Sequence, residues 1–162
     1  MRVGIGFDAH RFEGGRRLVL GGVEVPFDEG LAGHSDADVV LHALMDAMLG
    51  ACGAPDIGLL FPDGDPAYRD ASSLELLKRV VSVLRERGYS LGNADVTVIC
   101  EAPRIAGYSD MMCATIAGTC GVEKDALSVK GKTTEGMGFT GQRQGIAAIA
   151  VALMEPLQAD WR

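Results

Sequence analysis

Apolar residues alternate with glycine or polar residues along the N-terminal segment RVGIGFDAH. Val3, Ile5 and Phe7 recur with a period of two, which predicts a β-strand with one apolar face. Asp8 and His10 continue the other half of the alternation, so both side chains are expected to project from the opposite face.

A strand pair and a helix are predicted next. The segment LVLGGVEVP (18–26) has β-type residues on both sides of Gly21-Gly22, a glycine pair typical of a tight turn or bulge. In HSDADVVLHALMDAMLGACG (34–53), apolar residues recur at helical spacing behind a Ser35-x-x-Asp38 start and before a Gly53 stop.

Three polar residues of this helix are spaced four apart. Asp38, His42 and Asp46 are therefore predicted to share one helix face. Either aspartate is one turn from His42 and is a candidate to orient its imidazole.

The rest of the chain mixes both periodicities. Residues 54–70 are rich in proline and aspartate and have no sustained period, which is typical of a functional or mobile connection. A helix starting at Ser72-x-x-Glu75, a strand in NADVTVICEAP, a helix over 109–120 and a strand over 127–132 are predicted. GIAAIAVALM (145–154) is compatible with helix or strand. The mixture favours an α+β or α/β class with helices covering one face of a sheet.

Composition narrows the function classes. The 162 residues, 48% of them hydrophobic, are enough for one core and predict a single domain over 1–162. A net charge of −7 provides no extended basic surface for nucleic acid or anionic lipid. No run of about 20 apolar residues predicts a membrane span. The four cysteines form no CxxC pair, so a reducing, cytoplasmic location is expected.

The first candidate site is a metal centre. Asp8, His10 and His42 provide one oxygen and two nitrogens, a set that suits zinc and leaves a fourth position open for catalysis. The pattern Asp-x-His is also compatible with a turn acid and a surface histidine, and His34 with a solvated loop residue.

The second candidate site is a phosphate-binding loop. KGKTTEGMGFTG (130–141) combines lysines, threonines and glycines, all of which favour phosphate oxygens. Glu135 fits there as a ligand of a hard cation such as magnesium, although a solvent-exposed turn has the same composition. The chain contains no GxSxG, HExxH, Walker A or GxGxxG pattern, so metal-assisted chemistry at a phosphate is favoured. A zinc phosphohydrolase and a metal-stabilised oligomeric binding protein are the alternatives.

Five segments in order carry a resemblance to a known family: GFDAHRF, GLAGHSDADVVLHALMDAMLGA, DIGLLFPDGDPAYRDASSLELL, GYSLGNADVTVICEAPRI and VKGKTTEGMGFTG. Together they resemble the 2-C-methyl-D-erythritol 2,4-cyclodiphosphate synthases of the non-mevalonate isoprenoid pathway. The resemblance implies conversion of 4-diphosphocytidyl-2-C-methyl-D-erythritol 2-phosphate to the cyclic diphosphate with release of CMP. It also implies a two-layer α+β fold with a mixed sheet, and a homotrimer with active sites between subunits.

The resemblance also implies roles for individual residues. Asp8, His10 and His42 would bind zinc, and Glu135 would hold a second cation, magnesium or manganese. His34 and Thr133 would stabilise the transition state. The substrate would contact residues of several segments: Asp8, Ala9 and His10; His34 and Ser35; Asp56, Ile57, Gly58, Phe61, Pro62, Asp63, Gly64 and Asp65; Cys100, Glu101, Ala102, Pro103, Arg104, Ile105 and Ala106; Lys132, Thr133, Thr134 and Glu135; and Phe139.

The chain departs from the family pattern in two places. Lys132 stands where many members have threonine, and Gln142-Arg143-Gln144 follows Thr140-Gly141 where the familiar pattern is R-x-E. A phosphate contact from position 142 is therefore not carried over to this chain.

Overall fold

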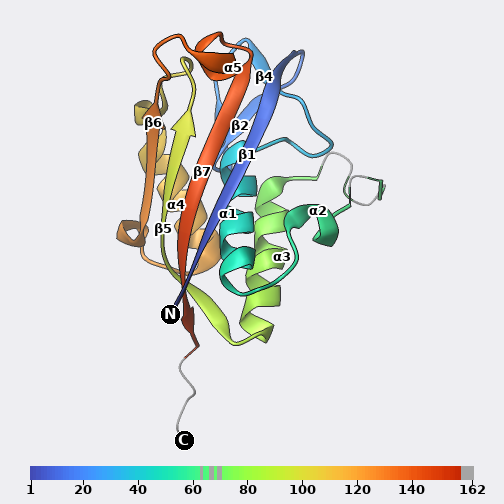
Figure 1. Ribbon diagram of the computed structural model, residues 1–162, viewed down its shortest axis with the longest axis vertical. Helices are drawn as coiled ribbons and strands as arrows, with labels where there is room; N and C mark the ends of the chain where they lie inside the picture. The colour runs from blue at the N-terminus through green and yellow to red at the C-terminus, as the bar shows by residue number, and fades with distance from the viewer. Residues whose placement is uncertain (63, 66–67, 69–70, 158–162) are drawn as a thin grey trace, which may run out of the picture.

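A mixed five-stranded sheet forms one layer of the protein (Figure 1). The computed structural model describes residues 1–62, 64–65, 68 and 71–157. The strand order is β4-β1-β7-β5-β6, and only the β5–β6 pair is parallel. The strands are β1 (Arg2–Gly14), β4 (Glu29–Leu31), β5 (Tyr89–Ile99), β6 (Leu127–Lys132) and β7 (Gly145–Pro156).

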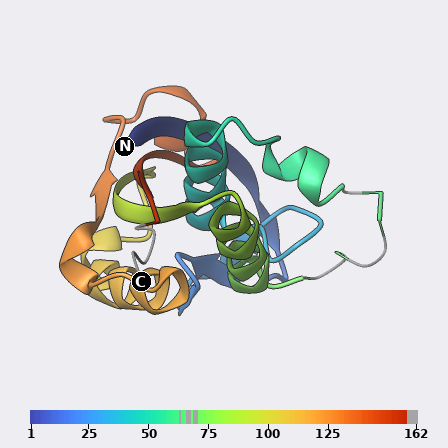
Figure 2. The same cartoon turned by 90° about the horizontal axis from the view of Figure 1, so that it is seen from below.

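Helices cover one face of this sheet, as predicted, and leave the other face bare (Figures 1 and 2). The helical segments are α1 (Val39–Ala51), α2 (Ile57–Leu60), α3 (Ser73–Glu86), α4 (Ser109–Cys120), α5 (Gly138–Gly141) and the 3-10 turns η2 (Ile105–Gly107) and η3 (Lys124–Ala126). In the part of the chain that the structure describes, none of them has the length and apolarity to span a membrane.

Glycines end or connect elements where the sequence predicted. A separate hairpin, β2 (Leu18–Leu20) and β3 (Val23–Val25), turns at Gly21 and Gly22, which have φ values of 59° and 74°. Helix α4 ends at Gly121 with φ 74°, a left-handed conformation that costs glycine little. These predictions are confirmed.

The predicted start of α3 at Ser72 is confirmed, whereas the predicted start of α1 at Ser35 is wrong. Helix α1 begins after Asp38, whose carboxylate accepts hydrogen bonds from the backbone of Val40 and Leu41, so Asp38 rather than Ser35 is the N-cap. Ser72 precedes α3 but makes no side-chain capping bond to the described residues. A carboxylate from another segment takes this place, because Asp36 Oδ2 accepts from Ser73 N at 2.9 Å.

The ambiguous segment 145–154 is a strand, and tertiary packing explains its alanines. Strand β7 is central, pairing with both β1 and β5. The buried alanines at its centre face α1, and the larger apolar residues between them point to the bare face. The helix-facing residues are Ala148, Ala150 and Ala152, and the outward ones are Ile149 and Val151.

Helix α1 lies in direct contact with the backbone of β1. A Cβ atom added to Gly4 would be 2.0 Å from Ala47 O, and one added to Gly6 would be 2.0 Å from Ala43 O. Both distances are far below van der Waals contact, so only glycine fits at these two positions. This contact places α1 beside the strand that carries Asp8.

The substitution Gly6→Ala should move α1 away from β1. We expect the free energy of unfolding to fall by about 3 kcal/mol and metal affinity to weaken, because overpacking displaces the helix backbone. Urea unfolding and zinc titration measure the two effects. Gly14→Ala is the matched control in the same strand, since its Cβ would meet no described atom within 4 Å. Equal stability of the two variants would refute the packing constraint.

Candidate metal centre and adjoining cavities

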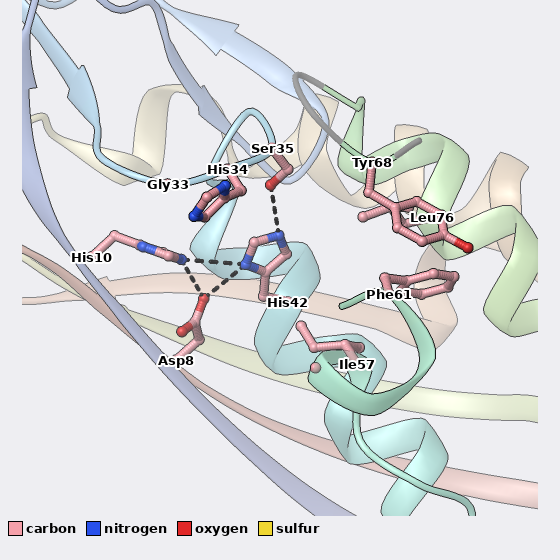
Figure 3. A pocket seen from close by; sticks show the side chains of 11 residues that line it. Asp8, His10, Gly33, His34, Ser35, His42, Ile57, Phe61, Tyr68 and Leu76 are labelled. Carbon is pink, nitrogen blue, oxygen red and sulfur yellow. Dashed lines mark hydrogen bonds and ion pairs between the residues drawn. The ribbon is translucent and has the colours of Figure 1, made fainter. Parts of the chain in front are cut away.

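Three side chains from two elements converge at one point (Figure 3). Asp8 and His10 project from the helix-facing side of β1, two residues apart, and His42 projects from the first turn of α1. Asp8 Oδ2 lies 2.9 Å from His10 Nε2 and 3.0 Å from His42 Nδ1, and the two ring nitrogens are 3.3 Å apart. Within the described part of the chain, no other three metal-ligating side chains gather in this way.

These separations fit a metal ion. Ligands at the usual zinc distances of about 2.0–2.1 Å in a tetrahedron would be about 3.3 Å from one another. The observed distances of 2.9, 3.0 and 3.3 Å are close to this value. One carboxylate and two imidazoles form a donor set that zinc favours. The three residues can therefore hold a metal ion while a fourth ligand position stays open.

The imidazole of His42 is oriented by residues that sequence spacing did not indicate. Its Nε2 lies 3.0 Å from Ser73 Oγ and 3.3 Å from Ser35 Oγ, on the opposite side of the ring from Asp8. Asp38 is occupied by four backbone N–H groups, and Asp46 accepts from Ile57 N at 2.9 Å. The prediction that Asp38 or Asp46 orients His42 is wrong.

The charges of Asp8 and His42 support each other in the metal-free site. Burial opposes ionisation of Asp8, but hydrogen bonds from His10 and His42 outweigh it and hold the pKa of Asp8 well below its ordinary value. Burial likewise opposes the charge of His42, yet the hydrogen bond and the charge of Asp8 raise the pKa of His42 above 6.5. Asp8 is therefore an anionic ligand at any physiological pH.

A cavity of about 240 Å³ opens beside this group. Its polar end includes the ligand residues together with His34 and Ser35, and its apolar end is formed by Ile57, Phe61, Tyr68 and Leu76, with Gly58 between them. Arg16 holds the loop around His34, donating from Nη1 to Gly33 O at 2.7 Å and from Nη2 to Ser35 O at 2.5 Å.

The other residues predicted for this region lie around the cavity rather than in it. Asp56 is exposed, and its carboxylate caps α2 by accepting from Leu59 N at 2.9 Å. Ala9 is exposed on β1 and donates its N–H to Asp8 Oδ1 at 2.9 Å. Pro62, Gly64 and Asp65 are exposed, and Asp63 lies outside the described residues.

A second cavity of about 440 Å³ is formed by the segments that follow β5 and end β6. It brings together most of the substrate-contact residues that the resemblance implies in these two segments: Cys100, Glu101, Pro103, Arg104, Ile105, Ala106, Lys132 and Thr133. Ala102 is half-buried beside them.

The loop after β6 is held in an unusual conformation. Glu135 has a φ of 53°, in the left-handed region that costs non-glycine residues energy and recurs at functional sites. Thr133 Oγ1 donates to Glu135 Oε1, and Glu101 Oε1 accepts from Thr134 N at 3.1 Å. Phe139 follows on α5 and is 44% exposed.

The two cavities lie on different parts of one chain. They share none of their described lining residues. Asp8 pairs with Ala148 on β7, and β5 separates β7 from β6, so the first cavity and the loop after β6 are three strand positions apart. Three spacings of about 4.8 Å make roughly 14 Å. This is the separation, within one chain, between the strand that carries Asp8 and the strand that leads to Glu135.

Several residues of the site had no local sequence signal. Ser73, Tyr68 and Leu76 are 26 or more residues from His42 in the chain and reach it only through the fold. Arg16 contacts the site only through backbone carbonyl groups, and Asp36 contacts it through Ser73. The acidic composition of residues 54–70 indicated a functional segment, but not which of its residues face the cavity.

Comparisons with known proteins agree with the geometry. The YgbB family model matches residues 1–155. A 2-C-methyl-D-erythritol 2,4-cyclodiphosphate synthase from Moorella thermoacetica is 55% identical over 154 residues, 95% of this chain and 94% of the relative. The bifunctional IspDF of Campylobacter jejuni superposes with a TM-score of 0.93 at 39% identity; the match covers 97% of this chain and 42% of that longer one.

A second similar structure is a nucleotide complex. A CDP complex of Plasmodium falciparum IspF has a TM-score of 0.85 at 31% identity, covering 97% of each chain.

Zinc binding to the metal-free protein should release a proton and weaken as the pH falls. Because the pKa of His42 is raised above 6.5, its imidazole carries a proton at lower pH that zinc must displace. Asp8 contributes no proton, since its lowered pKa keeps it ionised. Calorimetry at a pH of about 6, in buffers of different ionisation enthalpy, measures the release.

Two variants control this measurement. His42→Ala should stay folded but lose stoichiometric zinc, whereas His34→Ala, in the same cavity, should retain it. Binding without proton release, or a zinc-loaded His42→Ala protein, would contradict the ligand assignment.

Proposed function

Because the chain belongs to the YgbB family, together with the 2-C-methyl-D-erythritol 2,4-cyclodiphosphate synthases, we propose that it catalyses their reaction with its own Asp8-His10-His42 centre. It is an enzyme, a lyase of isoprenoid precursor synthesis that forms 2-C-methyl-D-erythritol 2,4-cyclodiphosphate. Its substrate is 4-diphosphocytidyl-2-C-methyl-D-erythritol 2-phosphate, and CMP leaves. The convergence of the three ligands beside a cavity is the observation that carries the proposal.

The reaction needs no nucleophile from the protein. The 2-phosphate of the substrate attacks the β-phosphorus, a P–O bond forms, and the bond from the β-phosphorus to the CMP oxygen breaks. Zinc bound to Asp8, His10 and His42 would supply positive charge to a β-phosphate oxygen at its open position. The protein's task is to place two phosphates in line and to exclude water, as in other phosphoryl transfers.

Polar residues around the cavity have matching roles. His34 and Ser35 lie on the loop that Arg16 holds in place. Both would donate hydrogen bonds to oxygens of the attacking phosphate and so stabilise the charge that develops in the transition state. Thr133 would do the same from the loop after β6. Ile57, Gly58 and Phe61 would contact the methylerythritol carbons, because they form the apolar end of the cavity. Asp56, at the start of α2, would accept hydrogen bonds from the hydroxyl groups.

The second cavity suits the cytidine end of the substrate. Backbone groups of residues 100–106 and 132–134 would contact the cytosine, and the CDP complex of the Plasmodium falciparum protein supports a CDP-linked ligand. Glu135 would bind magnesium or manganese, whose positive charge would offset the charge of the phosphates. Its left-handed backbone, 53° in φ, is consistent with a functional constraint.

A homotrimer would cover the bare face of the sheet. Val3, Ile5 and Phe7 on β1 are 68%, 70% and 59% exposed, and Ile149 and Val151 of β7 lie directly beside them. A contiguous apolar stripe of this kind is typical of a subunit interface.

Assembly would also complete the active site. Within one chain, β1 and β6 are three strand positions or roughly 14 Å apart, a distance that a diphosphate does not span. We therefore assign each site to two subunits, with Asp8, His10 and His42 from one chain and residues 132–135 from its neighbour.

Purified enzyme with zinc and magnesium should release CMP and the cyclic diphosphate in equal amounts. The product should contain no oxygen-18 when the reaction runs in labelled water, because the attacking oxygen belongs to the substrate. Mass spectrometry of the product tests both points. An open-chain, labelled product would instead indicate a zinc phosphohydrolase and refute the proposal.

Mixed trimers of His42→Ala and Glu135→Gln subunits should regain activity. Each variant alone has a defect in every site, but a mixed trimer pairs two intact halves in about one of its three sites. Co-expression with two affinity tags, followed by CMP-release assays, measures the recovery.

The control pairs His42→Ala with Asp8→Ala. Both defects are in the same half of the site, so mixing should restore nothing. Recovery in neither mixture would place Glu135 outside the shared site.

A further inference from the structure

We propose that Ser73, held by Asp36, is a positioning residue that fixes the ring orientation and tautomer of His42 for metal binding. The inference rests on the metal site of the proposed function and adds a residue from a third element to it. Ser73 is the first residue of α3, is fully buried, and does not line the cavity.

Hydrogen bonds connect the three residues in one direction. Ser73 Oγ donates to Asp36 Oδ1 at 2.5 Å, and Asp36 Oδ2 accepts from Ser73 N at 2.9 Å. Since the carboxylate takes the hydroxyl proton, Ser73 Oγ presents its lone pairs to His42 Nε2, 3.0 Å away. When a metal is bound, His42 must then carry its one proton on Nε2, which leaves the lone pair of Nδ1 for the metal beside Asp8 and His10.

Asp36 is itself anchored on both sides of this contact. Its backbone N–H donates to Ala71 O at 3.1 Å, while its carboxylate binds both donors of Ser73. The carboxylate thus also serves as the missing cap of α3. The N-terminus of α3 and the loop that carries Ser35 and Asp36 are therefore joined through Ser73, the residue that contacts His42.

Ser35 is the weaker partner of the same nitrogen. Its Oγ is 3.3 Å from His42 Nε2 and already accepts from Ala37 N at 3.1 Å. It also lines the cavity, where a ligand can compete for its hydroxyl. Ser73 has no such competitor, so it provides the lasting orientation of the ring.

Residues that hold a metal-ligating histidine by its second nitrogen commonly contribute about 10- to 100-fold to metal affinity. We expect Ser73→Ala to lower zinc affinity by about 10-fold or more. Asp36→Asn should have a smaller effect, because the amide oxygen still accepts from the Ser73 hydroxyl but the negative charge is gone. Competition with a chromogenic chelator, at a temperature well below unfolding, measures the affinities of the folded proteins.

A spectroscopic measurement separates positioning from a merely structural role. In the zinc-loaded protein, proton–nitrogen correlation spectra should show a hydrogen-bonded proton on His42 Nε2 that Ser73→Ala shifts or loses. Cobalt substituted for zinc should show altered d–d bands in the same variant. A change in stability alone would leave both spectra and the zinc affinity unchanged.

Ser72→Ala is the matched control, one residue away, at the exposed N-cap of α3. It should bind zinc like the unmodified chain, and Ser73→Thr should recover affinity by restoring the hydroxyl. Zinc affinities of Ser73→Ala and Asp36→Asn within twofold of Ser72→Ala would overturn the inference, and Asp36→Asn alone decides it if Ser73→Ala does not fold. Failure of the unmodified chain to release CMP would refute the reaction but leave this order of affinities intact.

Discussion

Gly4 and Gly6 let the backbone of α1 lie directly on β1, at a distance that a methyl group on either residue would prevent. This contact determines the geometry of the metal centre. Asp8 follows Gly6 on the same side of the strand, and His42 is the neighbour of Ala43, whose carbonyl contacts Gly6. With a wider layer spacing, Asp8 Oδ2 and His42 Nδ1 would not be 3.0 Å apart. The small residues of β1 and β7 therefore serve the site as well as the core.

The alternation of β1 has two consequences on two faces. Its small and polar half faces the helices and carries two metal ligands, whereas its apolar half is exposed beside Ile149 and Val151. In the proposed trimer these halves would act together, because the interface that covers the apolar stripe also brings the neighbour's Glu135 to the site. A strand with one polar and one apolar face can thus couple assembly to catalysis.

Electrostatics favours the binding of metal ions in the proposed reaction. The chain has a net charge of −7, yet the proposed substrate carries several phosphate charges. The overall field of the protein opposes such a ligand, so attraction must come from local cations. Asp8 is kept ionised by hydrogen bonds from its histidine neighbours. Asp36 accepts a hydrogen bond from the Ser73 hydroxyl, which in turn contacts His42. Both carboxylates favour a cation at the centre.

The sequence by itself determined the features that depend on neighbouring residues. The shared face of Asp8 and His10, the Gly21-Gly22 turn, the apolar period of α1 and the end of α4 at Gly121 were all predictable, because strand and helix periods and glycine conformations are local properties. The resemblance of five segments to a known family added the prediction that Asp8, His10 and His42 bind one metal ion. Tertiary structure alone decided that β7 is a central strand, since its alanines are explained only by the helix above them. It also decided that Asp38 caps α1 while Ser73 orients His42, because hydrogen-bond partners 31 residues apart leave no period in a sequence.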